Sequence, residues 1–168
     1  MKDPKNILIT GGSSGIGEAL ACHYAQSGVF LALSGQNSDR LAKVAEACRQ
    51  KGAEVETALV NVCDQKAMQS WINQISEEYP LDLVIANAGI SGGSGGRLEG
   101  EPIAEARRIF DVNVTGVFNT VEPSLKVMSQ SGKEGQIAIV SSLAGFRGWP
   151  GAPAYSASKG ALTIMIKN

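Results

Sequence analysis

The chain has 168 residues, of which 15 are basic and 16 acidic, so its formal charge at neutral pH is −1. This length is typical of one domain, and a hydrophobic content of 43% is sufficient for a buried core. The balanced charge, with no basic cluster, argues against nucleic acid and anionic membranes as partners. Cys22, Cys48 and Cys63 are spaced neither as a disulfide framework nor as a zinc site. No apolar run is long enough to span a bilayer, so we expect a cytoplasmic protein.

Short apolar runs alternate with helical patterns along the chain. The apolar runs predict strands at residues 6–10, 29–33, 54–60, 81–86 and 136–140. The helical patterns predict helices at residues 18–25, 38–51, 65–78, roughly 103–128, and from 154 to the end. Pro123 is expected to kink or divide the helix at 103–128. Because strands and helices alternate, we predict an α/β fold in which a doubly wound parallel sheet is covered on both faces.

A glycine-rich turn, Thr10-Gly-Gly-Ser-Ser-Gly-Ile-Gly17, separates the first predicted strand from the first predicted helix. Glycine at this place allows a tight turn, close approach of the backbone to a pyrophosphate, and close packing of the helix on the strand. Backbone N–H groups and the positive end of the helix dipole then hold the phosphates. The turn therefore predicts a dinucleotide-binding site.

The same turn also matches the pattern Gly-x-Ser-x-Gly of serine hydrolases, at residues 11–15, and residues 92–96 match it as well. In such a hydrolase the histidine base follows the nucleophile and the acid in the chain. The only histidine is His23, on the first predicted helix shortly after Ser13. We therefore reject a hydrolase and interpret His23 as an ordinary surface or packing residue.

Tyr155 and Lys159 lie four residues apart, so on a helix they share a face. A lysine ammonium beside the phenol favours the phenolate and lowers the tyrosine pKa from its usual value of about 10. Such a tyrosine can exchange a proton with an alcohol or carbonyl oxygen near neutral pH. Ser141 and Ser142 end the fifth strand, at the edge where parallel sheets bind ligands, so Ser142 is expected to hydrogen-bond the same oxygen.

Taken together, these segments resemble the short-chain dehydrogenases/reductases of the single-domain kind. The matching segments are Thr10–Gly17, Asn87-Ala-Gly89, Asn113 in Asp-Val-Asn-Val-Thr-Gly, Ser142 in Val-Ser-Ser-Leu-Ala-Gly, and Tyr155-Ser-Ala-Ser-Lys159. The resemblance implies a Rossmann-like fold and reversible hydride transfer between a nicotinamide cofactor and a small carbonyl or alcohol.

The resemblance also implies a role for each catalytic residue. Tyr155 corresponds to the proton donor or acceptor, and Lys159 to the residue that lowers its pKa and holds the nicotinamide ribose. Ser142 corresponds to the group that positions the substrate oxygen. Asn113 corresponds to a member of a proton relay that works through a water.

The cofactor-binding residues implied by the resemblance come from the glycine turn, the strand ends, the Asn-Ala-Gly motif and the last helix. No metal site is expected among them. They are Gly11, Ser13, Ser14, Gly15, Ile16, Gly17, Gln36, Asn61, Val62, Asn87, Ala88, Gly89, Tyr155 and Lys159.

The choice between NAD and NADP stays open. An acid at the end of the second strand would hold the ribose hydroxyls, and a base would favour a 2′-phosphate, but Ser34-Gly-Gln-Asn37 carries neither charge. Arg40 could reach such a phosphate, but it is expected on the exposed face of its helix. Asn61-Val62 stands where the family usually has Asp-Val.

Members of the family usually continue with further strands and a segment that covers the substrate, whereas this sequence ends at Asn168, within the last predicted helix. The fold is therefore expected to lack the last strands of the family, which leaves the fifth strand at an edge. We favour an oxidoreductase. A catalytically impaired fragment, or a module that binds a nucleotide or partner without efficient turnover, stays open as the alternative. Weak or no turnover is expected from the 168-residue chain.

No domain boundary is apparent, so residues 1–168 are expected to form one dinucleotide-binding domain that carries the catalytic residues and is incomplete at its C-terminus. Residues 92–96 are predicted to be a surface loop within it. Phe146 and Trp149 are expected either to wall the substrate site or to pack against the chain's own helices. The resemblance implies a homodimer or homotetramer, paired through the helix at 103–128 and the helix that carries Tyr155. A set of apolar residues at 103–128 fits a buried face, which either such pairing or packing in the chain's own core explains: Phe110, Val114, Val117, Phe118 and Val121.

Overall fold

The computed structural model describes residues 3–92 and 101–165, in which five parallel strands form one sheet in the order β3-β2-β1-β4-β5. The sheet order reverses at β1, which β2 flanks on one side and β4 on the other, and α/β sheets bind ligands beside such a reversal. The predicted doubly wound parallel sheet is confirmed. The strands are β1 (Asn6–Ile9), β2 (Phe30–Ser34), β3 (Glu54–Ala58), β4 (Leu83–Ala86) and β5 (Gln136–Ile139).

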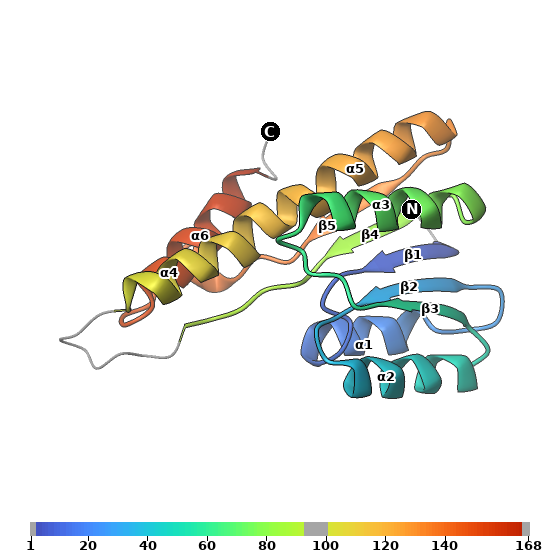
Figure 1. Cartoon of the computed structure of the whole chain (residues 1–168), viewed down its shortest axis with the longest axis horizontal. Helices are drawn as coiled ribbons and strands as arrows, with labels where there is room; N and C mark the ends of the chain where they lie inside the picture. Colours follow the sequence, from blue (N-terminus) through green and yellow to red (C-terminus); the bar gives the residue numbers. More distant parts are fainter. Residues whose placement is uncertain (1–2, 93–100, 166–168) are drawn as a thin grey trace.

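Helices cover both faces of the sheet (Figure 1). One face carries α1 (Gly15–Tyr24) and α2 (Ser38–Gln50), and the other carries α3 (Gln65–Glu78) and α5 (Gly116–Ser131). The remaining helices, α4 (Ile103–Phe110) and α6 (Pro153–Met165), pack on each other beyond the carboxyl ends of the strands. None of the helices in the described residues is long and apolar enough to cross a membrane.

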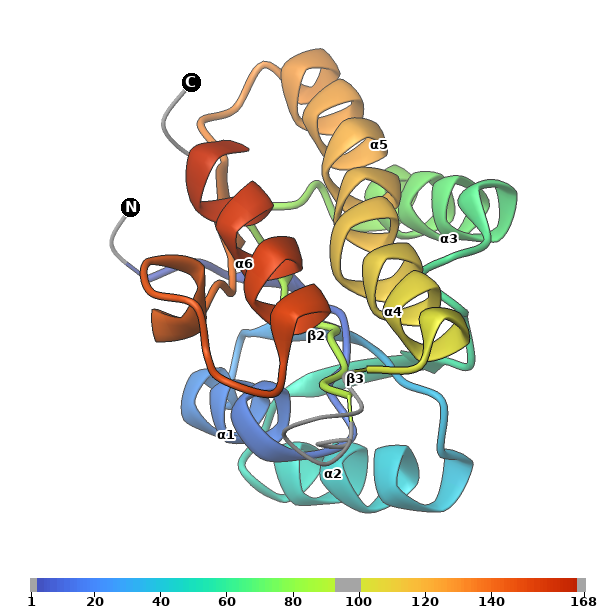
Figure 2. The ribbon, with the colours of Figure 1, turned by 90° about the vertical axis from the view of Figure 1, so that its left-hand side faces the viewer.

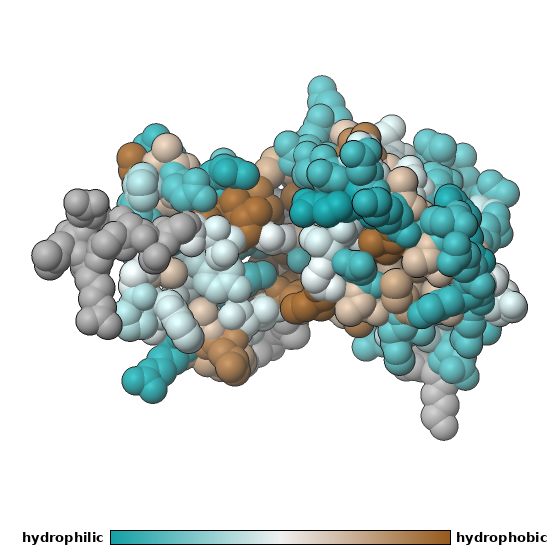
Figure 3. Space-filling view, turned by 90° about the horizontal axis from the view of Figure 1, so that it is seen from below, coloured by the Kyte–Doolittle hydropathy of each residue, from teal (hydrophilic) through white to brown (hydrophobic). Residues whose placement is uncertain are grey.

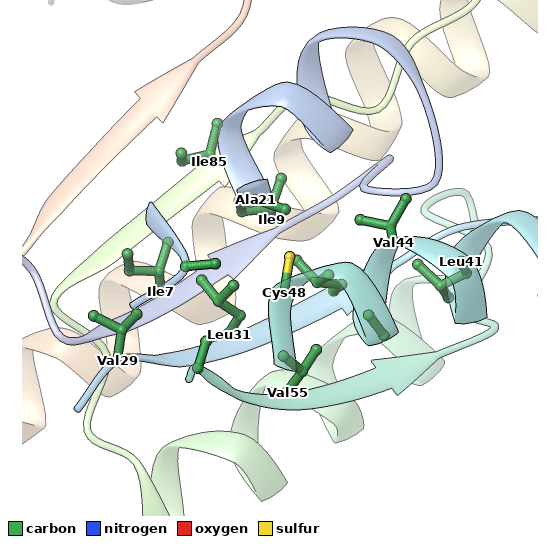
Figure 4. Close-up of a cluster of buried hydrophobic side chains, with 14 of the residues drawn as sticks. Ile7, Ile9, Ala21, Val29, Leu31, Leu41, Val44, Cys48, Val55 and Ile85 are labelled. Carbon is green, nitrogen blue, oxygen red and sulfur yellow. The ribbon is translucent and has the colours of Figure 1, made fainter. Parts of the chain in front are cut away.

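The strands are apolar on both faces because each face is covered by helices. On β2, Leu31 and Leu33 belong to the cluster beneath α1 and α2, whereas Phe30 and Ala32 belong to the cluster beneath α3. Figure 4 shows the first cluster, in which side chains of the sheet meet those of α1 and α2. Cys48 lies in this cluster, and burial, with a smaller contribution from Cys22, raises the pKa of its thiol to about 12. This packing fixes the strand ends, and the loops that follow them, in one arrangement.

The predicted helix at 103–128 is interrupted, but not at Pro123. The interruption is a π-helical turn, η1 (Asp111–Thr115), between α4 and α5, and Figure 2 shows the three segments following one another as a single rod. Pro123 lies within α5 and is buried, so the expectation that it divides the helix was wrong. The extra residue of the π turn places Asn113 inward, fully buried.

Within the described residues, β5 is an edge strand, since it pairs with β4 alone. On one side of β5, Ile139 packs against a cluster that contains Val117 and Val121 of α5 and Leu162 of α6. The short 3₁₀ helix η2 (Leu143–Gly145), which follows β5, lies so close to α6 that a Cβ on Gly145 would be 2.7 Å from the carbonyl oxygen of Lys159. The path of the chain after β5 is therefore fixed against α6. Most of the predicted glycine loop, residues 93–96, lies outside the described residues.

Candidate active site

The glycine turn is packed so tightly that two of its positions accept only glycine. Gly11 has a φ of +68°, and a Cβ there would lie 2.9 Å from Ala88 Cα. A Cβ on Gly17 would overlap the carbonyl oxygen of Gly11. The N-cap residue of α1, Ser14, makes no side-chain cap hydrogen bond. The turn thus presents the first backbone N–H groups of α1 and the hydroxyl of Ser14, which caps none of them. Both are donors that suit phosphate oxygens.

Hydrogen bonds between the ends of β1 and β4 form the floor beneath this turn. Thr10 Oγ1 accepts from the backbone N–H groups of Asn87 and Ala88, at 3.1 Å each. Asn87 Nδ2 donates to the carbonyl oxygens of Thr10, at 2.9 Å, and of Gly11, at 3.2 Å. The Asn-Ala-Gly motif therefore holds the glycine turn in place rather than contributing a charge.

A cavity of about 840 Å³ lies at the carboxyl ends of the strands, and the segments that follow all five strands contribute to its lining. Figure 3 shows the surface from below, hollowed between the end that carries α4 and α6 and the end that carries most of the sheet. Every predicted cofactor-binding residue lines this cavity except Gly15 and Gly17, which shape the turn. Motif matching missed several lining residues at or after the ends of strands, including Ser34, Val60, Val140 and Ser141. Arg40, which was expected on the exposed face of its helix, also lines the cavity.

Asn113 joins the loop after β4 to α6. Its Nδ2 donates to the carbonyl oxygen of Ile90 at 2.9 Å and to Ser158 Oγ at 3.0 Å, and its Oδ1 accepts from the N–H of Ile90 at 2.8 Å. A Cβ on Gly89 would lie 3.3 Å from both Asn113 Oδ1 and Lys159 Nζ. The amide and the ammonium therefore flank the same glycine. The proton relay predicted for Asn113 stays a prediction.

Lys159 brings a buried amine to the site. The residue is 5% exposed, and its Nζ donates to the carbonyl oxygen of Val140 at 2.9 Å. Nζ also lies 6.0 Å from the centre of the Tyr155 ring. Burial lowers the pKa of Lys159 below its usual value, because the charged form loses solvation. Lys159 makes no ion pair with any residue that the structure describes.

Tyr155 lies where the first cavity meets a second cavity of about 540 Å³. Ser142 and Trp149 also line the second cavity. The hydroxyl of Ser142 accepts from the N–H of Ala144 at 3.2 Å, which fixes it at the start of η2. Trp149 therefore forms an apolar wall of this cavity, whereas Phe146, 72% exposed, lines neither cavity.

Glu101 caps the helix that carries Tyr155, and no sequence pattern indicates this contact. Glu101 Oε2 accepts the N–H of Ala154 at 2.6 Å, and this is the first N–H of α6 because Pro153 has none. The other carboxylate oxygen is buried beside Gly92, where a Cβ would lie 2.8 Å away. Glu101 thus ties the start of α6 to the segment that leads into α4.

Comparison with known proteins identifies the family. The model of the short chain dehydrogenase family matches residues 5–168. The chain belongs to the short-chain dehydrogenase family. It is 37% identical over 166 residues to a 3beta-hydroxysteroid dehydrogenase of Mediterraneibacter gnavus, covering 98% of this chain and 59% of that protein. It is 33% identical over 159 residues to sulfoacetaldehyde reductase 2 of Chromohalobacter salexigens, covering 91% and 60%.

Solved structures of family members match the fold over nearly the whole chain. A xylitol dehydrogenase bound to NAD+ superposes with a TM-score of 0.91 at 29% identity, covering 98% of this chain and 64% of that one. A short chain dehydrogenase/reductase from Burkholderia phymatum in complex with NAD gives a TM-score of 0.90 at 29% identity, covering 98% and 58%. The chain thus spans less than two thirds of the length of these relatives.

Replacing Glu101 with alanine is expected to free the first turn of α6. Because a charge-assisted hydrogen bond is lost, the amide of Ala154 should exchange its hydrogen at least about tenfold faster, measured by hydrogen-exchange NMR. Glu101→Gln keeps an acceptor oxygen and should change the rate less. The amide of Leu162, further along α6, is the internal control. Equal exchange at Ala154 in the wild type and both variants would contradict the cap.

Replacing Lys159 with methionine is expected to raise the midpoint of thermal unfolding by a few degrees at neutral pH, because a buried charge is removed while the alkyl packing stays. The lowered pKa means that the unfolded chain holds the proton more tightly, so stability rises with pH between the folded pKa and the usual 10.5. The gain should therefore shrink in alkaline solution.

Melting curves followed by circular dichroism measure the effect. The exposed Lys126→Met, on α5, is the matched control and should show no such pH dependence. A destabilised Lys159→Met protein would show that the bond to Val140 outweighs the cost of burying the charge.

Proposed function

We propose that the chain acts as an NAD(P)-dependent oxidoreductase that transfers a hydride between the nicotinamide and a small carbonyl or alcohol. The observation that carries this proposal is the position of Tyr155, which lines both cavities. A cofactor in the first cavity and a substrate in the second would meet at its phenol. Membership of the short-chain dehydrogenase family supports the proposal.

The hydrogen-bond donors and the volume of the first cavity fit a dinucleotide. The uncapped start of α1 and the hydroxyl of Ser14 suit a pyrophosphate, and Gly11 and Gly17 leave the backbone open to close approach. Its volume, about 840 Å³, is within the range of cofactor sites. On this proposal, residues 1–168 act as one dinucleotide-binding domain that carries the catalytic residues.

The side chains around the junction divide the chemistry among them. A nicotinamide held in the first cavity would supply or accept the hydride. Tyr155 gives its proton to the substrate oxygen during reduction and takes it back during oxidation. Ser142, on the wall of the second cavity, holds that oxygen in line with the phenol. The ammonium of Lys159 stabilises the negative charge that develops on the phenol. Asn113 holds the loop after β4 and helix α6 together, and it takes part in the predicted proton relay.

Tyr155→Phe is expected to lower carbonyl reduction by about 10²–10⁴-fold, because the substrate oxygen then has no proton donor. Cofactor binding should stay unchanged, because the ring and its packing remain. The rate is measured on any longer form of the chain that is active, because turnover by the 168 residues alone is expected to be weak. Cofactor binding is measured on the 168-residue chain by energy transfer from tryptophan to NADH or NADPH. A Tyr155→Phe protein that keeps most of the unsubstituted protein's rate would contradict the assigned acid/base. Cofactor binding without turnover in the longer form as well would instead favour a binding module.

We further propose that a second copy of the chain packs on the helix that contains η1. Val117 and Val121, predicted on a buried face, pack in the chain's own core, whereas Phe110 and Phe118 are exposed. The exposed apolar residues recur at steps of seven or eight, and the step of eight spans the π turn, which adds one residue and keeps them in line. They form one stripe, which we call the apolar stripe: Ile103, Phe110, Phe118 and Leu125, exposed by 69%, 40%, 50% and 56%.

Phe118→Glu is expected to shift the protein towards monomer, because it places a charge in the middle of the apolar stripe. Sedimentation velocity at several protein concentrations measures the change. Lys43→Glu, an exposed substitution on α2, is the control for added negative charge. A wild-type protein that is monomeric at every concentration would contradict the pairing.

A further inference from the structure

The second cavity is lined by hydroxyls and apolar groups. Among the described residues around it, the polar side chains are the hydroxyls of Ser91, Ser142 and Tyr155, and none of the lining side chains is charged. Lys159 lines the first cavity but not this one. A ligand here therefore meets hydroxyls that can orient it and an otherwise apolar wall. The rest of the lining is Gly92, Leu143, Ala144, Trp149, Pro150, Gly151 and Ala152.

Trp149 gives this cavity a large apolar side chain on a backbone that is held in place. Its N–H donates to Ser156 Oγ at 2.9 Å, and its carbonyl oxygen accepts from the N–H of Ala152 at 3.1 Å. Ser156 is buried and follows Tyr155 directly on α6. Trp149 itself is 68% exposed, so the described residues leave most of its surface uncovered. The first turns of α6 thus position both the phenol and an indole that a ligand can cover.

Gly92 contributes bare backbone to another part of the lining. A Cβ at this position would lie 2.8 Å from Glu101 Oε1 and 3.0 Å from Ile109 Cδ1, so a side chain would displace the groups packed behind it. The cavity therefore has a flat indole on one part of its wall and a backbone without a side chain on another. Such a lining suits a flat apolar group, because a ring can lie against both without meeting a branched side chain.

Glu101 places a carboxylate directly behind Gly92. One of its oxygens, Oε2, accepts from the N–H of Ala154, but Oε1 is buried and has no hydrogen-bond partner in the part of the chain that the structure describes. Glu101 also makes no ion pair with any described residue. Because this oxygen is shut off from water, its charge is only weakly screened. The carboxylate therefore repels an anionic group that enters the second cavity.

We infer that the second cavity takes an uncharged ketone or alcohol carried on a flat apolar ring, with Trp149 covering the ring and Glu101 excluding carboxylates and sulfonates. This inference rests on the proposed function, since it names the substrate class of the cavity in which the proposed reaction takes place. The reacting oxygen meets the hydroxyls of Ser142 and Tyr155, and the ring lies on the indole. Selection is thus by shape and by charge, through two residues that take no part in the proton transfer.

Two aromatic ketones test the inference by binding alone. Acetophenone and phenylglyoxylate share a phenyl ketone and differ in a methyl group against a carboxylate. The intact 168-residue chain is titrated with each and followed by saturation-transfer difference NMR. The wild type should bind acetophenone at least about tenfold more tightly than phenylglyoxylate. Trp149→Ala should weaken acetophenone binding by about tenfold, because the ring contact is lost. Phe146→Ala, which removes an exposed ring that does not line the cavity, should leave it unchanged.

Glu101→Gln tests the charge separately, because glutamine keeps an acceptor oxygen for the N–H of Ala154. This variant should bind phenylglyoxylate more tightly and so remove most of the difference between the two ketones. A difference that survives Glu101→Gln would overturn the assignment to Glu101, and unchanged acetophenone binding by Trp149→Ala would overturn the assignment to Trp149. Equal binding of the two ketones by the wild type would overturn the exclusion of anions.

Titration of the same wild-type sample with NADH and NADPH separates this inference from the proposed function. A chain that binds a cofactor but neither ketone would overturn the inference while the proposed function stands. A chain that binds acetophenone but neither cofactor would overturn the proposed function instead. Binding of neither a ketone nor a cofactor would overturn both.

Discussion

The buried amide of Asn113 connects three parts of the molecule that the active site needs together. It lies in the π turn of the helix, bonds both backbone groups of Ile90 in the loop after β4, and donates to Ser158 on α6. These bonds join the loop after β4 directly to α6, beside the packing of α4 on α6 and the cap by Glu101. A buried amide that lost these partners would leave polar groups unsatisfied, at a cost of about 1–3 kcal/mol each. The position of Tyr155 relative to the cavity therefore depends on an interaction that is neither charged nor exposed.

The site is built from polar groups that the surrounding fold holds at a cost in stability. Lys159 is buried, with the carbonyl oxygen of Val140 as the one hydrogen-bond partner of its amine within the described residues, and burial lowers its pKa. Ser34 keeps an unpaired hydroxyl under the cavity, among the residues that the structure describes. The well-packed clusters on both faces of the sheet offset these costs, because they bury large apolar side chains almost completely. Groups kept in this state are ready to meet a bound ligand without rearrangement.

The sequence predicted the fold well, because apolar strands that alternate with amphipathic helices leave few arrangements other than a covered parallel sheet. It placed the interruption of the long helix wrongly. Proline is a visible signal, but Pro123 is accommodated inside α5, and the π turn at Asn113 has no residue pattern that marks it. Motifs located part of the cavity lining and missed residues such as Val60 and Val140, and the roles given to the located residues stay predictions. Contacts such as Glu101 with Ala154, 53 residues apart, depend on tertiary packing that no local pattern records.

The π turn also sets the register between α4 and α5. An α-helix turns about 100° per residue, so if the same residues formed a regular α-helix without the π turn, all of α5 would be rotated by about that angle relative to α4. Val117 and Val121 would then leave the core, and the exposed phenylalanines before and after the turn would no longer lie along one line. A regular α-helix at this point would therefore place the side chains of α5 wrongly against their neighbours. The chain keeps an irregular turn because two surfaces, one inside and one outside, are set to its register.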